Sequence, residues 1–135
     1  MKREIVLNPD VMPPKGPYAQ AIKVSGNHTT IYTGTIASLD KQWNVVGAND
    51  IRLQTRQTIE NLKGILEAAG ASLADVISTT WYLTRIEDMP VVAEIRNELF
   101  QGNMPASGTI PINGLFYPEL LLEMSAIAVI PTRNE

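Results

Sequence analysis

Residues 120–131 read LLLEMSAIAVIP, an almost continuous apolar run that Pro131 stops. A run of this length bounded by a proline favours a buried β-strand. The one charged side chain within it is Glu123, and a carboxylate in such surroundings is costly unless it is paired or used in chemistry. Strand alternation places it on one face with Leu121, Ser125, Ile127 and Val129. The stretch therefore predicts a core strand that also carries a candidate acid or base.

Four further segments favour extended structure and supply partners for this strand. Residues 75–84 are rich in β-branched and aromatic side chains and predict a central strand. Residues 106–112 predict a short strand. Residues 25–28, Ser-Gly-Asn-His, are typical of a turn, and the segments on either side favour extended structure. They predict a hairpin of residues 17–26 and 28–37.

Two amphipathic helices are expected between these strands. Apolar side chains recur at helical spacing from residue 51 to residue 69, before Gly70, and Asn49-Asp50 offers an N-terminal cap. A second helix is expected between the cap Asp88 and Gly102. The order strand-strand-helix-strand-helix-strand-strand predicts an α+β fold, a mixed sheet with both helices on one face. The other face then needs a cover, so we expect more than one subunit.

Composition bounds the chemistry. The 135 residues predict a single domain over residues 1–135, with 44% hydrophobic and 19% charged side chains. No cysteine and one histidine exclude a disulfide framework, cysteine nucleophiles and zinc sites built on two imidazoles, and no glycine-rich phosphate loop is present. We therefore expect no metal and no cofactor. Fourteen acidic against 11 basic residues predict no nucleic-acid or membrane partner, and without a signal peptide or membrane span the expected address is the cytoplasm.

Three further places in the sequence are candidates for a site, and two of them also have a structural explanation. Tyr18 follows Gly16-Pro17 at a strand start, where its hydroxyl can reach a cleft. The stretch Thr33-Gly34-Thr35 suits a ligand held by backbone groups, or a β-bulge. Arg96 lies near the apolar stripe of the second helix. Either its stem packs there while its head reaches solvent, or its head meets a carboxylated ligand. For Glu123 the alternative is an edge or subunit contact in which an arginine pairs with it.

The chain resembles the Rid family, the YjgF-type reactive-intermediate deaminases, over nearly its whole length. The matching residues are Gly16-Pro17-Tyr18-Ala19-Gln20, Tyr32-Thr33-Gly34, Gln54, Asn61, Ala68-Ala69-Gly70, Asp75-Val76-Ile77, Thr79-Thr80, Pro105-Ala106, and Glu123 before Ala126-Ile127-Ala128-Val129. The resemblance implies a chorismate-mutase-like fold and a homotrimer with a central barrel, with ligand clefts between neighbouring subunits. It also implies hydrolysis of small imines and enamines to keto compounds and ammonia, without metal or cofactor.

In such proteins an arginine directly after Pro-Ala grips the substrate carboxylate, and a glutamate with backbone groups positions the attacking water. Glu123 matches the glutamate, Tyr18 and Gly34 match pocket positions, and Thr33 and Thr35 flank Gly34. The arginine position is Ser107, which removes the charged bidentate pair. The pocket asparagine of the family matches Ala93.

These departures make the chain resemble an arginine-lacking branch of the family, in which some relatives hydrolyse aminomuconate-type enamines. Arg96, one turn after Ala93, is the candidate substitute charge. Glu123 with Ser107 or Thr109 would orient the water.

Two hypotheses of function follow, and a third rests on the apolar sheet alone. The first is a cofactor-free hydrolytic deaminase with Glu123 as acid or base. The second is a non-catalytic protein that binds a small molecule in the same intersubunit cleft. The third is an interaction module with chaperone-like behaviour.

Overall fold

Strand β7 lies inside a mixed sheet in the computed structural model, which describes residues 1–133. The strand order is β3-β7-β5-β6, and β4 also pairs with β7. Only β5 and β6 run parallel; the other pairs are antiparallel. The strands are β3 (His28–Tyr32), β4 (Ile36–Ala37), β5 (Val76–Leu83), β6 (Ala106–Pro111) and β7 (Leu122–Pro131).

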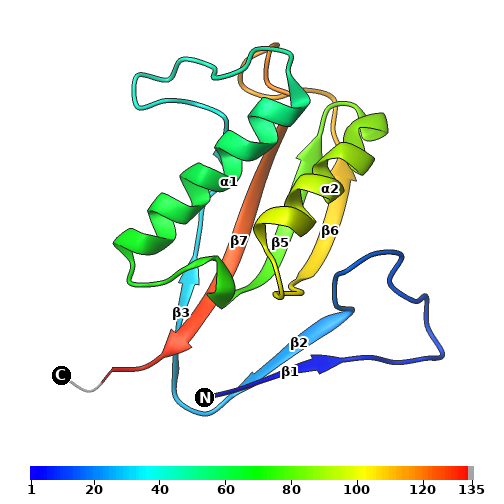
Figure 1. Ribbon diagram of the computed structural model, residues 1–135, viewed down its shortest axis with the longest axis vertical. Coiled ribbons are helices and arrows are strands. Elements are labelled where there is room, and N and C mark those ends of the chain that lie inside the picture. Colours follow the sequence, from blue (N-terminus) through cyan, green and yellow to red (C-terminus); the bar gives the residue numbers. More distant parts are fainter. Residues whose placement is uncertain (134–135) are drawn as a thin grey trace.

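Helices α1 (Ile51–Ala68) and α2 (Met89–Leu99) lie side by side on the same face of this sheet (Figure 1). Two short 3-10 turns, Leu73–Asp75 and Ile86–Asp88, precede β5 and α2. The core between helices and sheet contains the fully buried side chains Leu62, Leu66, Trp81, Leu83, Ile95, Leu122 and Met124. The predicted α+β architecture, with two helices on one face, is confirmed.

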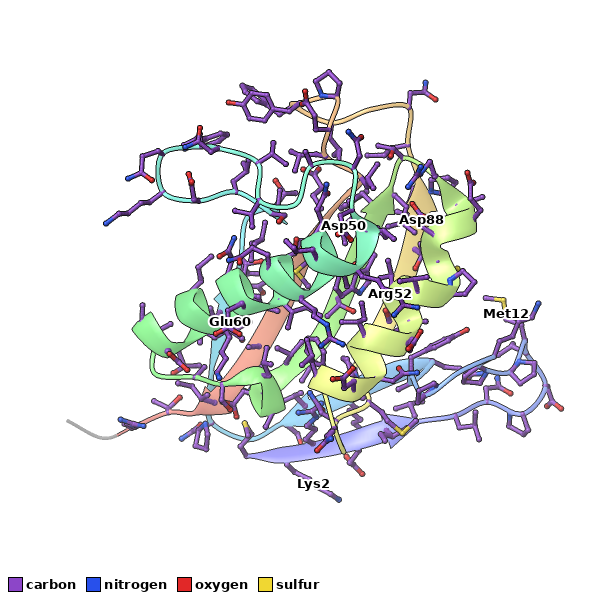
Figure 2. The ribbon with its side chains drawn as sticks, turned by 45° about the horizontal axis from the view of Figure 1, so that its top comes forward. Lys2, Met12, Asp50, Arg52, Glu60 and Asp88 are labelled. Carbon is purple, nitrogen blue, oxygen red and sulfur yellow. The ribbon has the colours of Figure 1, made fainter. Side chains whose placement is uncertain are left out.

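The two helices begin differently, although an aspartate stands at the start of each (Figure 2). Asp50 caps α1, because its carboxylate accepts a hydrogen bond from the backbone N–H of Leu53 at 3.1 Å. Asp88 makes no such bond; it pairs instead with Arg85 at 3.0 Å. Pro90 in the first turn of α2 has no N–H to satisfy, so it tolerates the missing cap.

The predicted hairpin of residues 17–26 and 28–37 is wrong in its pairing. Strand β2 (Ala21–Ser25) pairs with β1 (Lys2–Val6), a strand absent from the prediction, and β3 pairs with β7. The turn at Gly26 does connect β2 to β3, but β1 and β2 form a separate two-stranded sheet below the ends of β5 and β6 (Figure 1). Turn residues determine only the local chain reversal. Strand β3 pairs with β7 rather than β2 because pairing with β7 places it in the sheet that forms the core.

Alternation along β7 gives the sheet two unlike faces. Met124, Ala126 and Ala128 point toward the helices and are buried. Glu123, Ser125 and Ile127 are partly exposed on the face that the helices leave uncovered. Tyr32, paired with Ile127 across the sheet, is 75% exposed. Among residues 1–133, no helix has the length and apolar character needed to cross a membrane.

We expect Leu62→Ala to lower the free energy of unfolding by about 2–5 kcal/mol, because Leu62 is fully buried under the sheet and leaves a cavity. Urea denaturation followed by circular dichroism measures the loss. The control is Ile65→Ala in the same helix, where the side chain is 46% exposed and the loss should stay below about 1 kcal/mol. Equal losses would contradict the assignment of the buried face of α1.

Candidate active site

Five of the nine predicted site residues lie in two separate clusters. Ser107 pairs in register with Thr79, and both side chains face the helices. Glu123 lies on β7, two strands away from β6, and pairs in register with Tyr82 of β5. Its side chain is on the helix-free face of the sheet. With strands ~4.8 Å apart and ~3.4 Å per residue, the Cα atoms of Ser107 and Glu123 are separated by roughly 14 Å. One chain therefore does not bring the predicted catalytic pair into a single site.

The first cluster surrounds Arg96, a residue of α2 that is 7% exposed. Its Nη1 donates to Ser107 Oγ at 3.2 Å, and its guanidinium lies 6.0 Å from the centre of the Tyr18 ring. All three side chains line a cavity of about 220 Å³, which we call the Arg96 cavity; its wall also includes Pro17, Phe100 and Pro105. The structure therefore brings three of the predicted site residues, Tyr18, Arg96 and Ser107, to one cavity.

The hydrogen bonds in this cluster leave the Ser107 proton free. Trp81 Nε1 can only donate, and it donates to Thr79 Oγ1 at 3.1 Å. Thr79 then donates to Ser107 Oγ at 3.0 Å, and Arg96 donates to the same oxygen. Ser107 therefore accepts twice, and its own O–H is available to a ligand. The Arg96 cavity thus presents a guanidinium and a hydroxyl donor together.

The charge of Arg96 is unbalanced inside the protein. Burial lowers its pKa, and the nearby Tyr18 offsets this only in part. An arginine nevertheless stays protonated. Within residues 1–133 the ion pairs join other residues, and no carboxylate lies within salt-bridge distance of Arg96. A buried, unpaired guanidinium that lines a cavity favours binding of an anionic group there.

The second cluster surrounds Glu123, which lines an open hollow of about 710 Å³ along the edge at β4. We call this hollow the Glu123 cavity; Thr35 and Asn61 also line it. Burial raises the pKa of Glu123 above its ordinary value. In the described part of the chain, no arginine pairs with its carboxylate. A carboxyl group with a raised pKa that lines a cavity is a candidate for proton transfer to and from a ligand.

The stretch Thr33-Gly34-Thr35 forms a β-bulge, as the structural alternative predicts. Tyr32 pairs with Ile127 and Ile36 with Met124, so one extra residue lies on this side of the ladder. Thr33 secures the bulge, because its Oγ1 accepts from the N–H of Ala126 at 2.9 Å. A Cβ at Gly34 would meet nothing within 4 Å in one chain. Open space beside an exposed glycine leaves this backbone accessible to a ligand or a second copy.

Helix α1 fixes both segments that flank Glu123. The buried amide of Gln54 donates to Glu119 O at 2.7 Å and accepts from the N–H of Leu121 at 2.8 Å, just before β7. The amide of Asn61 donates to Ala37 O at 3.0 Å and to Leu39 O at 3.1 Å. Both residues are among those that carry the resemblance to the Rid family, but the sequence did not predict which backbone groups they bind.

Four predicted site residues line neither cavity, and two of them, Thr33 and Gly34, belong to the bulge described above. Ala93 sits on α2 one turn before Arg96, and Thr109 pairs with Trp81 in β6; neither lines the Arg96 cavity or the Glu123 cavity. Within the described chain, no cluster of three or more histidine, aspartate or glutamate side chains is placed to hold a metal ion.

An aromatic pair beside Glu123 was not anticipated. Trp43 and Phe116 both line the Glu123 cavity, with ring centres 5.6 Å apart at 63°. They are 59% and 76% exposed. Trp43 lies in the polar connection of residues 40–49. A large aromatic side chain in such a segment was the sequence signal that could have indicated a binding role.

Comparison with known proteins gives one consistent result. The family model described as endoribonuclease L-PSP matches residues 9–130. A RutC family protein of Pyrococcus abyssi is 38% identical over 128 residues, covering 95% of this chain and 98% of the relative. The 3-aminoacrylate deaminase RutC of Acinetobacter baylyi is 34% identical, with coverage of 95% and 98%. A 2-iminobutanoate/2-iminopropanoate deaminase of Dermatophagoides farinae is 30% identical, with coverage of 95% and 97%.

Solved structures agree with these relatives. The crystal structure of YyfB, a protein of the conserved Rid family from Yersinia pestis, superposes with a TM-score of 0.83 at 29% identity. The match covers 96% of this chain and all of that one.

Arg96→Met should leave the free energy of unfolding unchanged or raise it, because methionine fills similar space without a buried, unpaired charge. Ser107 still accepts from Thr79 in the variant. Urea denaturation of both proteins in the absence of ligand tests this. A loss clearly above about 1 kcal/mol would mean that Arg96 is held by native contacts rather than left for a ligand.

Glu123→Gln should gain stability relative to wild type as pH rises. Because the folded pKa is raised, the stability that this group contributes is fully present below the unfolded pKa. It is lost as pH rises from the usual carboxyl range through the raised folded pKa. The difference between variant and wild type should therefore grow across that window and then level off. Thermal unfolding from pH 4 to pH 8 measures it, and a difference independent of pH would contradict the raised pKa.

Proposed function

Because the chain belongs to the Rid family, the YjgF-type proteins matched by the endoribonuclease L-PSP model, we propose that it is a cofactor-free hydrolytic deaminase of small, carboxylated enamines or imines. Relatives that cover nearly the whole chain are named as deaminases of 3-aminoacrylate and of 2-iminobutanoate and 2-iminopropanoate. All of these compounds carry a carboxylate within two bonds of the carbon that bears the nitrogen. The proposal takes the reaction from the relatives and the substrate class from the site.

The observation that carries the proposal is the unpaired guanidinium of Arg96 beside Ser107. Serine at position 107 offers no charge, yet Arg96 reaches its hydroxyl at 3.2 Å from the neighbouring helix. A guanidinium and a free O–H in one small cavity match the two oxygens of a carboxylate. Arg96 thus supplies, from α2, the charge that the strand lacks, and simple 2-imino acids remain within the substrate class.

Glu123 has the properties that the hydrolytic step requires. An enamine first tautomerises to its imine, and water then adds to the C=N carbon. As the C–O bond forms, the Glu123 carboxylate takes a proton from the water and returns it to the nitrogen. In a second transfer the Glu123 carboxylate takes the proton of the carbinolamine hydroxyl and gives it to the nitrogen, the C–N bond breaks as the C=O bond forms, and the keto compound and ammonia leave. A raised pKa suits both the uptake and the return of the proton.

The two halves of the site are proposed to come from two copies of the chain. Arg96 and Glu123 lie on opposite faces of one sheet. A single chain therefore does not bring the guanidinium and the carboxyl group to the same substrate. The helix-free face exposes Tyr32 and Ile110, at 75% and 47%, which favours contact with another copy. A homotrimer with clefts between subunits would bring the Arg96 cavity of one copy to Glu123 of the next.

The main alternative is a small-molecule-binding protein that uses the same clefts without hydrolysis. Aminomuconate-type enamines are a second substrate class for the deaminase, since they also present a carboxylate. RNA cleavage, which the description of the family model names, has less support, because the net charge is −3 and the single histidine bonds to a backbone carbonyl at a turn.

We expect ammonia release above the uncatalysed rate from 3-aminoacrylate, from amino-acid imines generated in situ, or from an aminomuconate-type enamine. Arg96→Ala should raise KM at least tenfold, because the charged contact to the carboxylate is lost. Glu123→Gln should lower kcat by about 10²-fold or more, because the amide moves no proton.

The matched controls are Arg52→Ala and Glu94→Gln, an exposed ion pair on the outer side of the helices. Both should keep wild-type kinetics. Absence of turnover with every substrate, from protein that is folded and binds the keto acid product, would replace the deaminase with the binding alternative.

A further inference from the structure

Trp43 is held in a backbone conformation that its side chain disfavours. Its φ is 66°, in the left-handed region that bulky residues rarely adopt. The surrounding turn imposes this geometry. The Asp40 carboxylate accepts from the N–H groups of Gln42 and Asn44, both at 2.9 Å, and Asp40 O accepts from the N–H of Trp43 at 2.9 Å.

Core packing does not explain this strain, because the indole is 59% exposed. Its packing partner is Phe116, which is itself 76% exposed and meets Tyr117 edge to face at 5.0 Å. Trp43 and Phe116 come from loops more than 70 residues apart that converge on the Glu123 cavity. Backbone strain that presents exposed side chains to a cavity is typical of binding sites.

The residues that line the Glu123 cavity around Trp43 and Phe116 determine which kind of ligand group it can hold. Trp43, Phe116, Leu39 and Ile65 form an apolar part of the lining, and the hydrogen bonds of the turn occupy the Asp40 carboxylate. Lys41 and Glu60 also line the cavity. Two aromatic rings set at 63° leave ring faces and edges for a third ring to pack against. The cavity, at about 710 Å³, has room that the Arg96 cavity, at about 220 Å³, lacks.

We propose that the Trp43–Phe116 pair is a subsite for a flat, apolar ring, so that the protein prefers substrates with an aromatic side chain over small aliphatic ones. The inference rests on the proposed function only in taking this ring to be part of the deaminase substrate. The ring packs on the aromatic pair while the reacting carbon lies toward Glu123 in the same cavity.

Calorimetry with two stable keto acids tests the subsite without turnover. Phenylpyruvate and pyruvate share the 2-oxo acid group that imine hydrolysis releases and differ in the ring. Phenylpyruvate should bind the wild-type protein at least tenfold more tightly than pyruvate. Trp43→Ala should remove this preference and leave the affinity for pyruvate unchanged, Trp43→Phe should retain it, and the control Gln42→Ala on the same turn should match wild type.

Acrylamide quenching tests whether the subsite is open in the assembled protein. Of the two tryptophans, Trp81 is fully buried and Trp43 is exposed, so the quenchable signal should disappear in Trp43→Phe. If the wild-type protein has no quenchable indole, another copy covers the pair and the proposal is overturned. Equal binding of the two keto acids, or an unchanged preference in Trp43→Ala, would overturn it as well.

The outcomes separate the two proposals. A ring preference that depends on Trp43, in a protein that releases no ammonia from any substrate, supports the subsite and rejects the deaminase. Ammonia release with no preference between aromatic and aliphatic imines rejects the subsite and supports the deaminase.

Discussion

The alternation of side chains along β7 is the constraint on which the rest of the structure depends. One face of the strand delivers Met124, Ala126 and Ala128 to the core beneath the two helices. The same periodicity delivers Glu123 to the face that no helix covers. A shift of one residue in register would bury the carboxylate among apolar side chains and expose the core. The position of the candidate acid therefore follows from the same rule that builds the sheet.

A second constraint is the absence of a negative partner for Arg96. In the described chain no carboxylate forms an ion pair with this guanidinium. The exposed arginines Arg52 and Arg56 of α1, in contrast, form ion pairs with glutamates of α2 at 3.3 and 2.9 Å. A buried cation left unpaired beside a free hydroxyl is a cost to the fold that an anionic ligand relieves. Under the proposed function, a substrate carboxylate would be the negative partner that Arg96 lacks.

Much of this was predictable from the sequence, and the failures have physical reasons. The long apolar run predicted β7 and the face of Glu123, and spacing with the Asp50 cap predicted α1. The pairing of residues 21–25 was not predictable, because turn chemistry at Gly26 is local while strand partners are chosen by the core. Arg96 was a candidate charge, but the hydrogen bond to Ser107 depends on how a helix crosses a strand. The strain at Trp43 depends on backbone geometry that propensities do not contain.

Subunit mixing tests the central claim most directly, that Arg96 of one copy and Glu123 of another form one site. Arg96→Ala and Glu123→Gln proteins, each slower than wild type at a substrate concentration below the wild-type KM, would be unfolded together, refolded as mixed assemblies and assayed for ammonia release at that concentration. The account predicts recovered activity, because a Glu123→Gln chain still supplies Arg96 and an Arg96→Ala chain still supplies Glu123. Mixed assemblies, confirmed by native mass spectrometry, whose rate does not exceed that of the separate variants would contradict it.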